Sequence, residues 1–216
     1  MDPIIATVLG ISLIFVCTTL GSSFVFFFKK KEINEKVNQI SLGFAAGIMF
    51  AASIFSLINP ALETEISYMP SFLVVGISVI VGALFMWGID KLVPHLHVQN
   101  NQEEGIKTLG LNRTSKMFLA VTIHNIPEGL SVGIAYGIAL YYLNNGLDSS
   151  GAFYGALMLA IGIGIQNIPE GAAVSLPVKS ETGSIWKGFW FGTFSGIVEP
   201  IAAVIGLFLA YFIEPI

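Results

Sequence analysis

The sequence predicts an all-α membrane protein, a polytopic helix bundle with six transmembrane helices. Of its 216 residues, 54% are hydrophobic and 11% are charged, whereas soluble domains have about 45–50% apolar and about 25% charged residues. The apolar residues fall in six long runs. Each run is long enough to cross a hydrocarbon core, which takes about 20 helical residues.

The six expected spans form one integral membrane domain over residues 1–216. They cover residues 3–28, 40–59, 71–93, 117–143, 151–178 and 185–212. The first run is too long for a signal-peptide core and has no basic segment before it, so we interpret it as a span. A proline removes one helical hydrogen bond, and we therefore expect kinks at Pro127, Pro169 and Pro200.

The basic residues predict an orientation. All ten lie in or beside the connections that follow spans one, three and five, on one side of the bundle. Because loops rich in Lys and Arg stay in the cytoplasm, we expect the loop of residues 94–116 to be cytoplasmic. Both termini would then lie outside, with the protein in the plasma (cell inner) membrane. We interpret His95 and His97 in this loop as solvated side chains with no assigned role.

Four ionisable side chains lie deep inside the predicted spans, namely His124, Glu128, Glu170 and Glu199. A charged side chain at the centre of a bilayer costs about 3 kcal/mol on insertion scales. No Lys or Arg lies at a comparable depth to pair with them. A bound cation is therefore their expected partner.

Spans four and five carry the same motif. It reads His-Asn-Ile-Pro-Glu-Gly from His124 and Gln-Asn-Ile-Pro-Glu-Gly from Gln166. Residues three or four apart share a helix face, so each copy presents its glutamate beside its first two residues. The copies lie at similar depths in antiparallel neighbouring spans, and we expect them to face each other.

Imidazole and carboxylate ligands suit zinc and other first-row divalent ions. Span six adds Glu199, directly before a proline, and span two adds Met49, which by itself is more typical of packing. We therefore predict a midplane metal site. Its candidate residues are Met49, His124, Asn125, Glu128, Gln166, Asn167, Glu170 and Glu199.

At these motifs the chain resembles the ZIP family of zinc and iron transporters, most closely its bacterial branch. That family has His-Asn-x-Pro-Glu-Gly in its fourth helix, a related motif in its fifth and a Glu-Pro pair in its sixth. The resemblance implies transport of divalent metal ions into the cytoplasm, with Zn²⁺ as the foremost substrate and iron, manganese or cadmium as others. It implies no enzymatic activity, a homodimer within the lipid bilayer, and no nucleic-acid partner.

The resemblance also implies two metal ions that share Glu128 and Glu170. The first would use His124, Glu128, Gln166 and Glu170, with Met49 nearby, and the second Asn125, Glu128, Asn167, Glu170 and Glu199. Asn167 stands where some relatives have an acidic residue, which lowers the negative charge of the second site. The family has eight helices, whereas six spans are predicted here, so the resemblance implies that this chain ends after the sixth helix and we expect it to be incomplete as a transporter.

Three alternatives stay open on the residues alone. An intramembrane hydrolase would also need His and Glu at helical spacing, to activate a metal-bound water. The others are a proton-coupled carrier of an organic solute and a scaffold with buried polar contacts. A repeated motif has no evident role in a hydrolase, and unpaired glutamates do not fit a scaffold.

Overall fold

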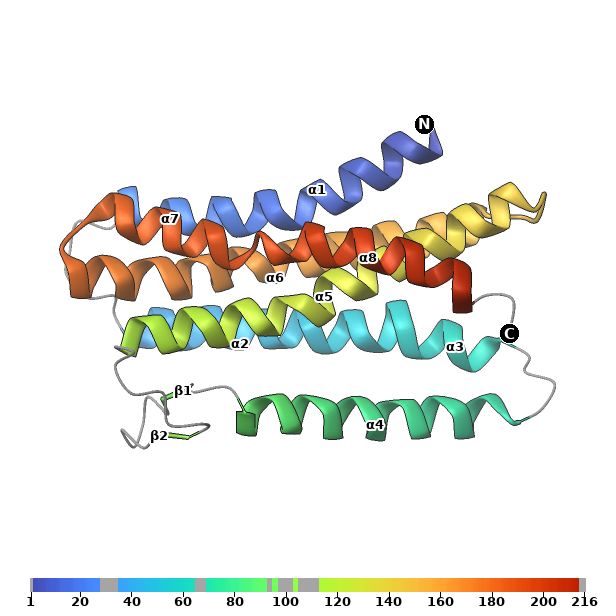
Figure 1. Cartoon of the computed structure of the whole chain (residues 1–216), viewed down its shortest axis with the longest axis horizontal. Coiled ribbons are helices and arrows are strands. Elements are labelled where there is room, and N and C mark those ends of the chain that lie inside the picture. Colours follow the sequence, from blue (N-terminus) through green and yellow to red (C-terminus); the bar gives the residue numbers. More distant parts are fainter. Residues whose placement is uncertain are drawn as a thin grey trace.

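The computed structural model of the chain describes residues 2–27, 35–64, 69–92, 95–96, 103–104 and 113–213. Most of these residues lie in long helices that run along one axis of the molecule (Figure 1). The helices are α1 (Pro3–Ser22), α2 (Glu35–Ala52), α3 (Asn59–Glu63), α4 (Ser71–Leu92), α5 (Arg113–Asn144), α6 (Ser150–Thr182), α7 (Ile185–Ser195) and α8 (Val198–Ile213). A 3₁₀ turn, η1 (Ser23–Phe26), follows α1, and a π-helical turn, η2 (Ser53–Ile58), joins α2 to α3. Two short strands, β1 (His95–Leu96) and β2 (Glu103–Glu104), pair antiparallel.

Within the part of the chain that the structure describes, six helical segments are long and apolar enough to cross a membrane. They are Pro3–Phe26, Ala46–Glu63, Ser71–Ile89, Thr114–Asn144, Ser150–Thr182 and Ile185–Phe212. These segments confirm the predicted all-α bundle with six spans. The second lies further along the chain than the predicted 40–59, because η2 and α3 continue the helical path to Glu63.

Local sequence signals fix several helix ends. The carboxylate of Asp2 accepts hydrogen bonds from the N–H groups of Ile4 and Ile5, and Pro3 opens α1 where no amide donor is needed. At the end of α6, Gly183 has a φ of 68°, and its N–H bonds to the Lys179 carbonyl. Glycine adopts this left-handed conformation without steric cost.

The helices differ at the three prolines where kinks are predicted. Pro127 and Pro169 lie inside continuous helices, and Figure 1 shows α5 changing direction along its length. Span six, in contrast, breaks into α7 and α8 before Pro200. Pro200 cannot donate to the Gly196 carbonyl, which accepts instead from the Glu199 N–H at 3.1 Å. Pro200 thus lies in the first turn of α8, where a missing N–H is tolerated.

Close packing joins α5 to α8 and α1 to α6 and α7. A Cβ added at Gly133 would collide with the backbone carbonyl of Ala203 on α8, and one at Gly171 would collide with that of Thr18 on α1. Small residues allow helix backbones in lipid to approach this closely. These contacts hold each helix that carries the repeated motif against a neighbour, α5 against α8 and α6 against α1, and α5 and α6 also pack against each other.

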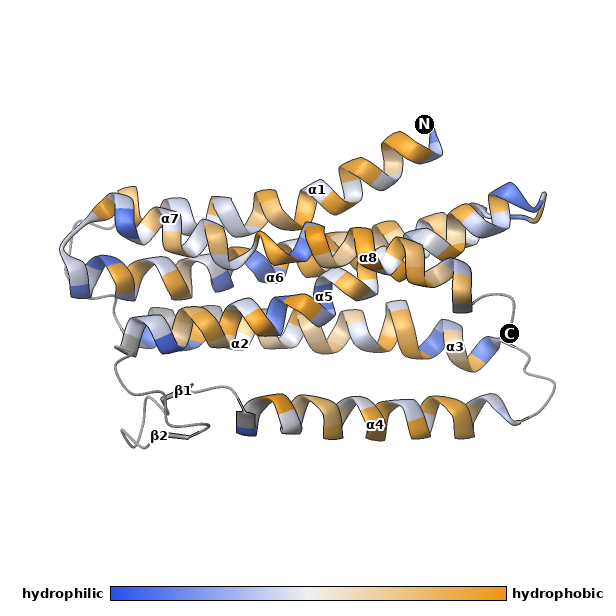
Figure 2. Cartoon of the chain, viewed as in Figure 1, coloured by the Kyte–Doolittle hydropathy of each residue, from blue (hydrophilic) through white to orange (hydrophobic). Residues whose placement is uncertain are grey.

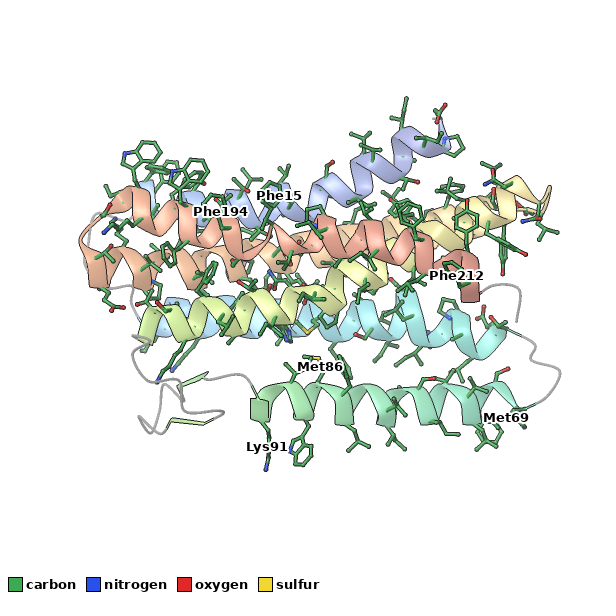
Figure 3. All side chains as sticks on the ribbon, in the orientation of Figure 1. Phe15, Met69, Met86, Lys91, Phe194 and Phe212 are labelled. Carbon is green, nitrogen blue, oxygen red and sulfur yellow. The ribbon has the colours of Figure 1, made fainter. Side chains whose placement is uncertain are left out.

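The helices α2 and α4 lie outside this packed group. α2 packs against α6, while α4 contacts α3 and forms a separate layer (Figure 1). α4 is apolar around most of its circumference (Figure 2), and its described residues are mostly exposed. Figure 3 shows Met86 on the side of α4 that faces α2, and Lys91 pointing away at its end. A helix that is apolar on all sides and uncovered by protein is suited to lipid.

Candidate metal site

The first half of the site, which we call the carboxylate–imidazole cluster, consists of His124 and Glu128 on α5 and Gln166 and Glu170 on α6. One ligand atom each from His124, Glu128 and Glu170 lie within 4.8 Å of one another. The Gln166 amide donates to Glu128 Oε1 at 2.6 Å, and His124 Nε2 lies 3.9 Å from the same oxygen. The structure therefore brings all four predicted residues together, at a spacing that one cation could span.

The second half, which we call the amide cluster, consists of Asn125 on α5, Asn167 on α6, Glu199 on α8 and Thr18 on α1. The Glu199 carboxylate accepts from the Asn125 amide at 2.9 Å and from Thr18 Oγ1 at 3.2 Å, both at Oε1. Its other oxygen accepts from the Asn167 amide at 2.7 Å. Four helices thus meet at one carboxylate.

The two clusters differ in exposure. The His124 side chain is 44% exposed and that of Glu128 is 11% exposed, whereas Asn125, Asn167 and Glu199 are 0% exposed. The carboxylate–imidazole cluster therefore reaches the surface of the bundle at His124, while the amide cluster is enclosed by protein.

Helix geometry explains why consecutive residues enter different clusters. At 3.6 residues per turn, adjacent side chains project about 100° apart, while residues three or four apart differ by about 40–60°. Glu128 therefore lies between the directions of His124 and Asn125. Glu170 stands in the same relation to Gln166 and Asn167. Each glutamate thus lies on the side of the carboxylate–imidazole cluster that borders the amide cluster, between the imidazole or glutamine of its motif and the asparagine.

Buried oxygen atoms without a hydrogen-bond partner are concentrated at this site. A buried polar atom that makes no hydrogen bond costs about 1–3 kcal/mol, so such atoms are rare in native interiors. Five of the seven such atoms among the described residues belong to the two clusters. They are Asn125 Oδ1, Glu128 Oε2, Gln166 Oε1, Asn167 Oδ1 and Glu170 Oε2. Oxygen atoms of this kind, together with an imidazole, fit a divalent metal ion.

Met49 lies on α2, which runs antiparallel to α6 (Figure 1). Ala52 of α2 faces Gly162 of α6, and a Cβ built on that glycine would lie 3.1 Å from the Ala52 Cβ. Met49 is one turn before Ala52, and Gln166 is one turn after Gly162. In antiparallel helices these two steps lead in the same direction, so Met49 lies at the depth of Gln166.

Thr18 is the site residue that sequence reasoning missed. A hydroxyl in an apolar span is common and usually bonds within its own helix, and Thr18 does bond to the Ile14 carbonyl at 3.1 Å. Its additional contact with Glu199 depends on how α1 packs against α8, which no local pattern indicates. Of the loop histidines, His97 lies outside the described residues, and of His95 only the backbone, in β1, is described.

Comparison with known proteins places the chain in a family. The profile described as "ZIP Zinc transporter" matches residues 4–117. This segment ends before His124, so the match does not test the repeated motif.

Similar proteins include bovine Zinc transporter ZIP11, which is 32% identical over all of this chain and 83% of its own length. Zinc transporter ZupT of Salmonella heidelberg is 31% identical over 99% of this chain and 76% of its own length. Zinc transporter ZIPB of Bordetella bronchiseptica is 32% identical over 93% of this chain and 61% of its own length. These relatives confirm the prediction of a multi-pass metal transporter rather than an enzyme, and the chain belongs to the ZIP zinc transporter family.

Proposed function

We propose that this chain carries divalent metal ions, zinc foremost, through the two clusters and into the cytoplasm. The observation that carries the proposal is the set of five buried, unpartnered oxygens in the two clusters, together with His124, at the point where the two motif copies meet. Ionisable residues inside a membrane mark ion pathways by default. The names of the relatives favour zinc, and the mixed oxygen and nitrogen donors fit it.

Two ions would occupy the site. The first would bind to His124, Glu128, Gln166 and Glu170, with Met49 at the same depth. The second would bind to Asn125, Glu128, Asn167, Glu170 and Glu199. Because Glu128 and Glu170 border the amide cluster, each would contribute to both ions.

Inward transport is proposed from the family resemblance, and the distribution of charge indicates which end of the bundle is cytoplasmic. Lys36, Lys116 and Lys187 lie near the starts of α2, α5 and α7, and Lys91 and Lys179 lie near the ends of α4 and α6. Figure 1 shows these helix ends toward the left of the bundle. The positive-inside rule assigns that end to the cytoplasm. Both termini and the α5–α6 connection would then lie outside the plasma membrane.

The apolar surface of α4 supports direct contact with lipid. We expect a homodimer because of the resemblance to the family.

The test is uptake by the purified chain in proteoliposomes, against a panel of Zn²⁺, Fe²⁺, Mn²⁺ and Cd²⁺, with zinc binding measured on the same preparation. We expect saturable uptake that is largest for zinc. A Glu181→Gln variant is the control, because Glu181 is an exposed glutamate near the end of α6. Uptake no faster than in protein-free vesicles, together with no zinc binding, would refute the proposal.

A further inference from the structure

The Glu199 carboxylate determines how both asparagine amides are turned. A carboxylate accepts hydrogen bonds but donates none, so each asparagine must face it with its NH₂ group. Asn125 uses its second proton for the Ser195 carbonyl at 3.2 Å, and Asn167 for the Ile14 carbonyl at 3.2 Å. Both protons of each NH₂ group are then donated in hydrogen bonds.

The amide oxygens are the atoms that remain. Asn125 Oδ1 and Asn167 Oδ1 are buried and have no partner, and a rotated amide would present its NH₂ group in their place. A cation can bind the oxygen of an amide but not its NH₂ group. The position of Glu199 therefore decides whether the amide cluster offers oxygen to a metal ion.

Thr18 is the contact from α1 that fixes Glu199. Its hydroxyl has one proton and two acceptors within reach, Glu199 Oε1 at 3.2 Å and the Ile14 carbonyl at 3.1 Å. The charged carboxylate is the stronger acceptor of the two. Thr18 is 1% exposed, and a Cβ added at Gly196 would lie 2.7 Å from its Cγ2, so the side chain is held firmly at the break between α7 and α8.

From these contacts we infer that Thr18 is a positioning residue of the metal site: it orients Glu199, and Glu199 orients the oxygens of Asn125 and Asn167 toward the second ion. The inference rests on the proposed function, because it assumes a divalent cation at the site. It makes α1 part of the binding machinery, although α1 contributes no residue to the predicted ligand set.

Hydrogen bonds to metal ligands affect binding measurably, and their loss typically weakens metal affinity by about 10–100-fold. The test compares Thr18→Val, which keeps the shape but removes the hydroxyl, with Thr18→Ser, which keeps the hydroxyl. Thr19→Val is the matched control, because Thr19 lies next on α1 and bonds to the Phe15 carbonyl of its own helix at 3.0 Å. Calorimetric titration of each variant of this chain with Zn²⁺ alone gives stoichiometry and affinity, and thermal unfolding without metal reports on the fold.

We expect Thr18→Val to bind the second zinc ion about 10-fold more weakly, at the lower end of that range, and to retain the first ion. Thr18→Ser should restore the second ion, and Thr19→Val should match the unchanged chain. Two ions bound by Thr18→Val with unchanged affinity would overturn the inference, as would an equal loss in Thr18→Ser. If Thr18→Val does not fold, Thr18→Ala replaces it under the same outcomes. Absence of zinc binding by the unchanged chain would overturn the proposed function and this inference together.

Discussion

The two halves of the site use the same helices to make two different environments. The carboxylate–imidazole cluster reaches the surface at His124, which is 44% exposed, and contains two glutamates from facing motifs. The amide cluster is closed, and its single carboxylate, Glu199, is surrounded by hydrogen-bond donors. The first cluster is therefore partly open at the surface of the bundle, whereas the second is enclosed and, by the inference above, holds an ion only where its amide oxygens are turned toward it.

The largest effect should come from the two glutamates that border the amide cluster. Replacing Glu128 with Gln removes one negative charge from both ion positions. We expect zinc uptake to fall by at least about 100-fold, since losing a direct ligand should cost more than the 10–100-fold typical of outer partners. Uptake is measured in proteoliposomes beside Glu181→Gln, and a Glu128→Gln chain as active as this control would contradict a shared role.

The exposed cluster should make zinc binding sensitive to pH. Imidazole and carboxylate must be deprotonated to bind a metal, so binding should weaken as the pH falls. If one proton is displaced per ion, affinity should drop by up to about 10-fold per pH unit. Calorimetry at pH 7.5 and 5.5, in buffers of different ionisation enthalpy, measures both the affinity and the released protons. Equal affinity at both pH values, with no proton release, would exclude these ligands.

The closed cluster should lose its own ion selectively. We expect Glu199→Ala to weaken the second ion by about 100-fold or more, since Glu199 is proposed as a direct ligand and the 10–100-fold range is typical of outer partners, and to leave the first bound. Anomalous scattering from zinc in crystals of the variant would show one retained peak and one lost peak. Loss of both peaks, or of neither, would show that the two clusters do not act as separate binding positions.

Adding a negative charge to the amide cluster should lower the stability of the metal-free protein and raise its affinity for the second ion. Asn167→Asp adds a charge that favours the second ion, but it also places a carboxylate where an amide donates to Glu199 Oε2. We expect the metal-free variant to melt at a lower temperature and its second zinc ion to bind roughly 5-fold more tightly, because affinity rises with ligand charge. Thermal unfolding with and without zinc tests both expectations. A variant that melts at the same temperature as the unchanged chain without metal and gains no affinity would contradict this account of the cluster.

The smallest effect should come from Met49, at the edge of the first cluster. Met49→Leu keeps the volume and removes the thioether, which soft ions prefer. We expect zinc uptake to change by less than about threefold, and cadmium uptake to fall more than zinc uptake. Competition between the two ions in one vesicle preparation measures this ratio. A loss as large as that of Glu128→Gln would mean that Met49 is a principal ligand.

The carboxylate–imidazole cluster was accessible from sequence because its chemistry is local. The spacing of His124 to Glu128 and of Gln166 to Glu170 places each pair on one helix face, and the repeated motif implies that the faces meet. The free-energy cost of placing a carboxylate inside a membrane indicated the same residues. The six spans were accessible for a similar reason, since length and hydropathy are properties of single segments.

The amide cluster was accessible only in part, because its arrangement depends on tertiary packing. The sequence identified Glu199 and both asparagines, but not the hydrogen bonds that orient them. These depend on the break of span six near Gly196 and on the approach of Thr18 from α1. A threonine in an apolar span carries no signal of such a contact.

The proposed function requires that His124, Glu128 and Glu170 bind a divalent cation together. The most direct measurement is anomalous diffraction at the zinc absorption edge from crystals of this chain grown with zinc. We expect an anomalous peak between the α5 and α6 motif copies, within bonding distance of His124 and both glutamates. Zinc found only elsewhere in the protein, with no peak between the two motif copies, would contradict it.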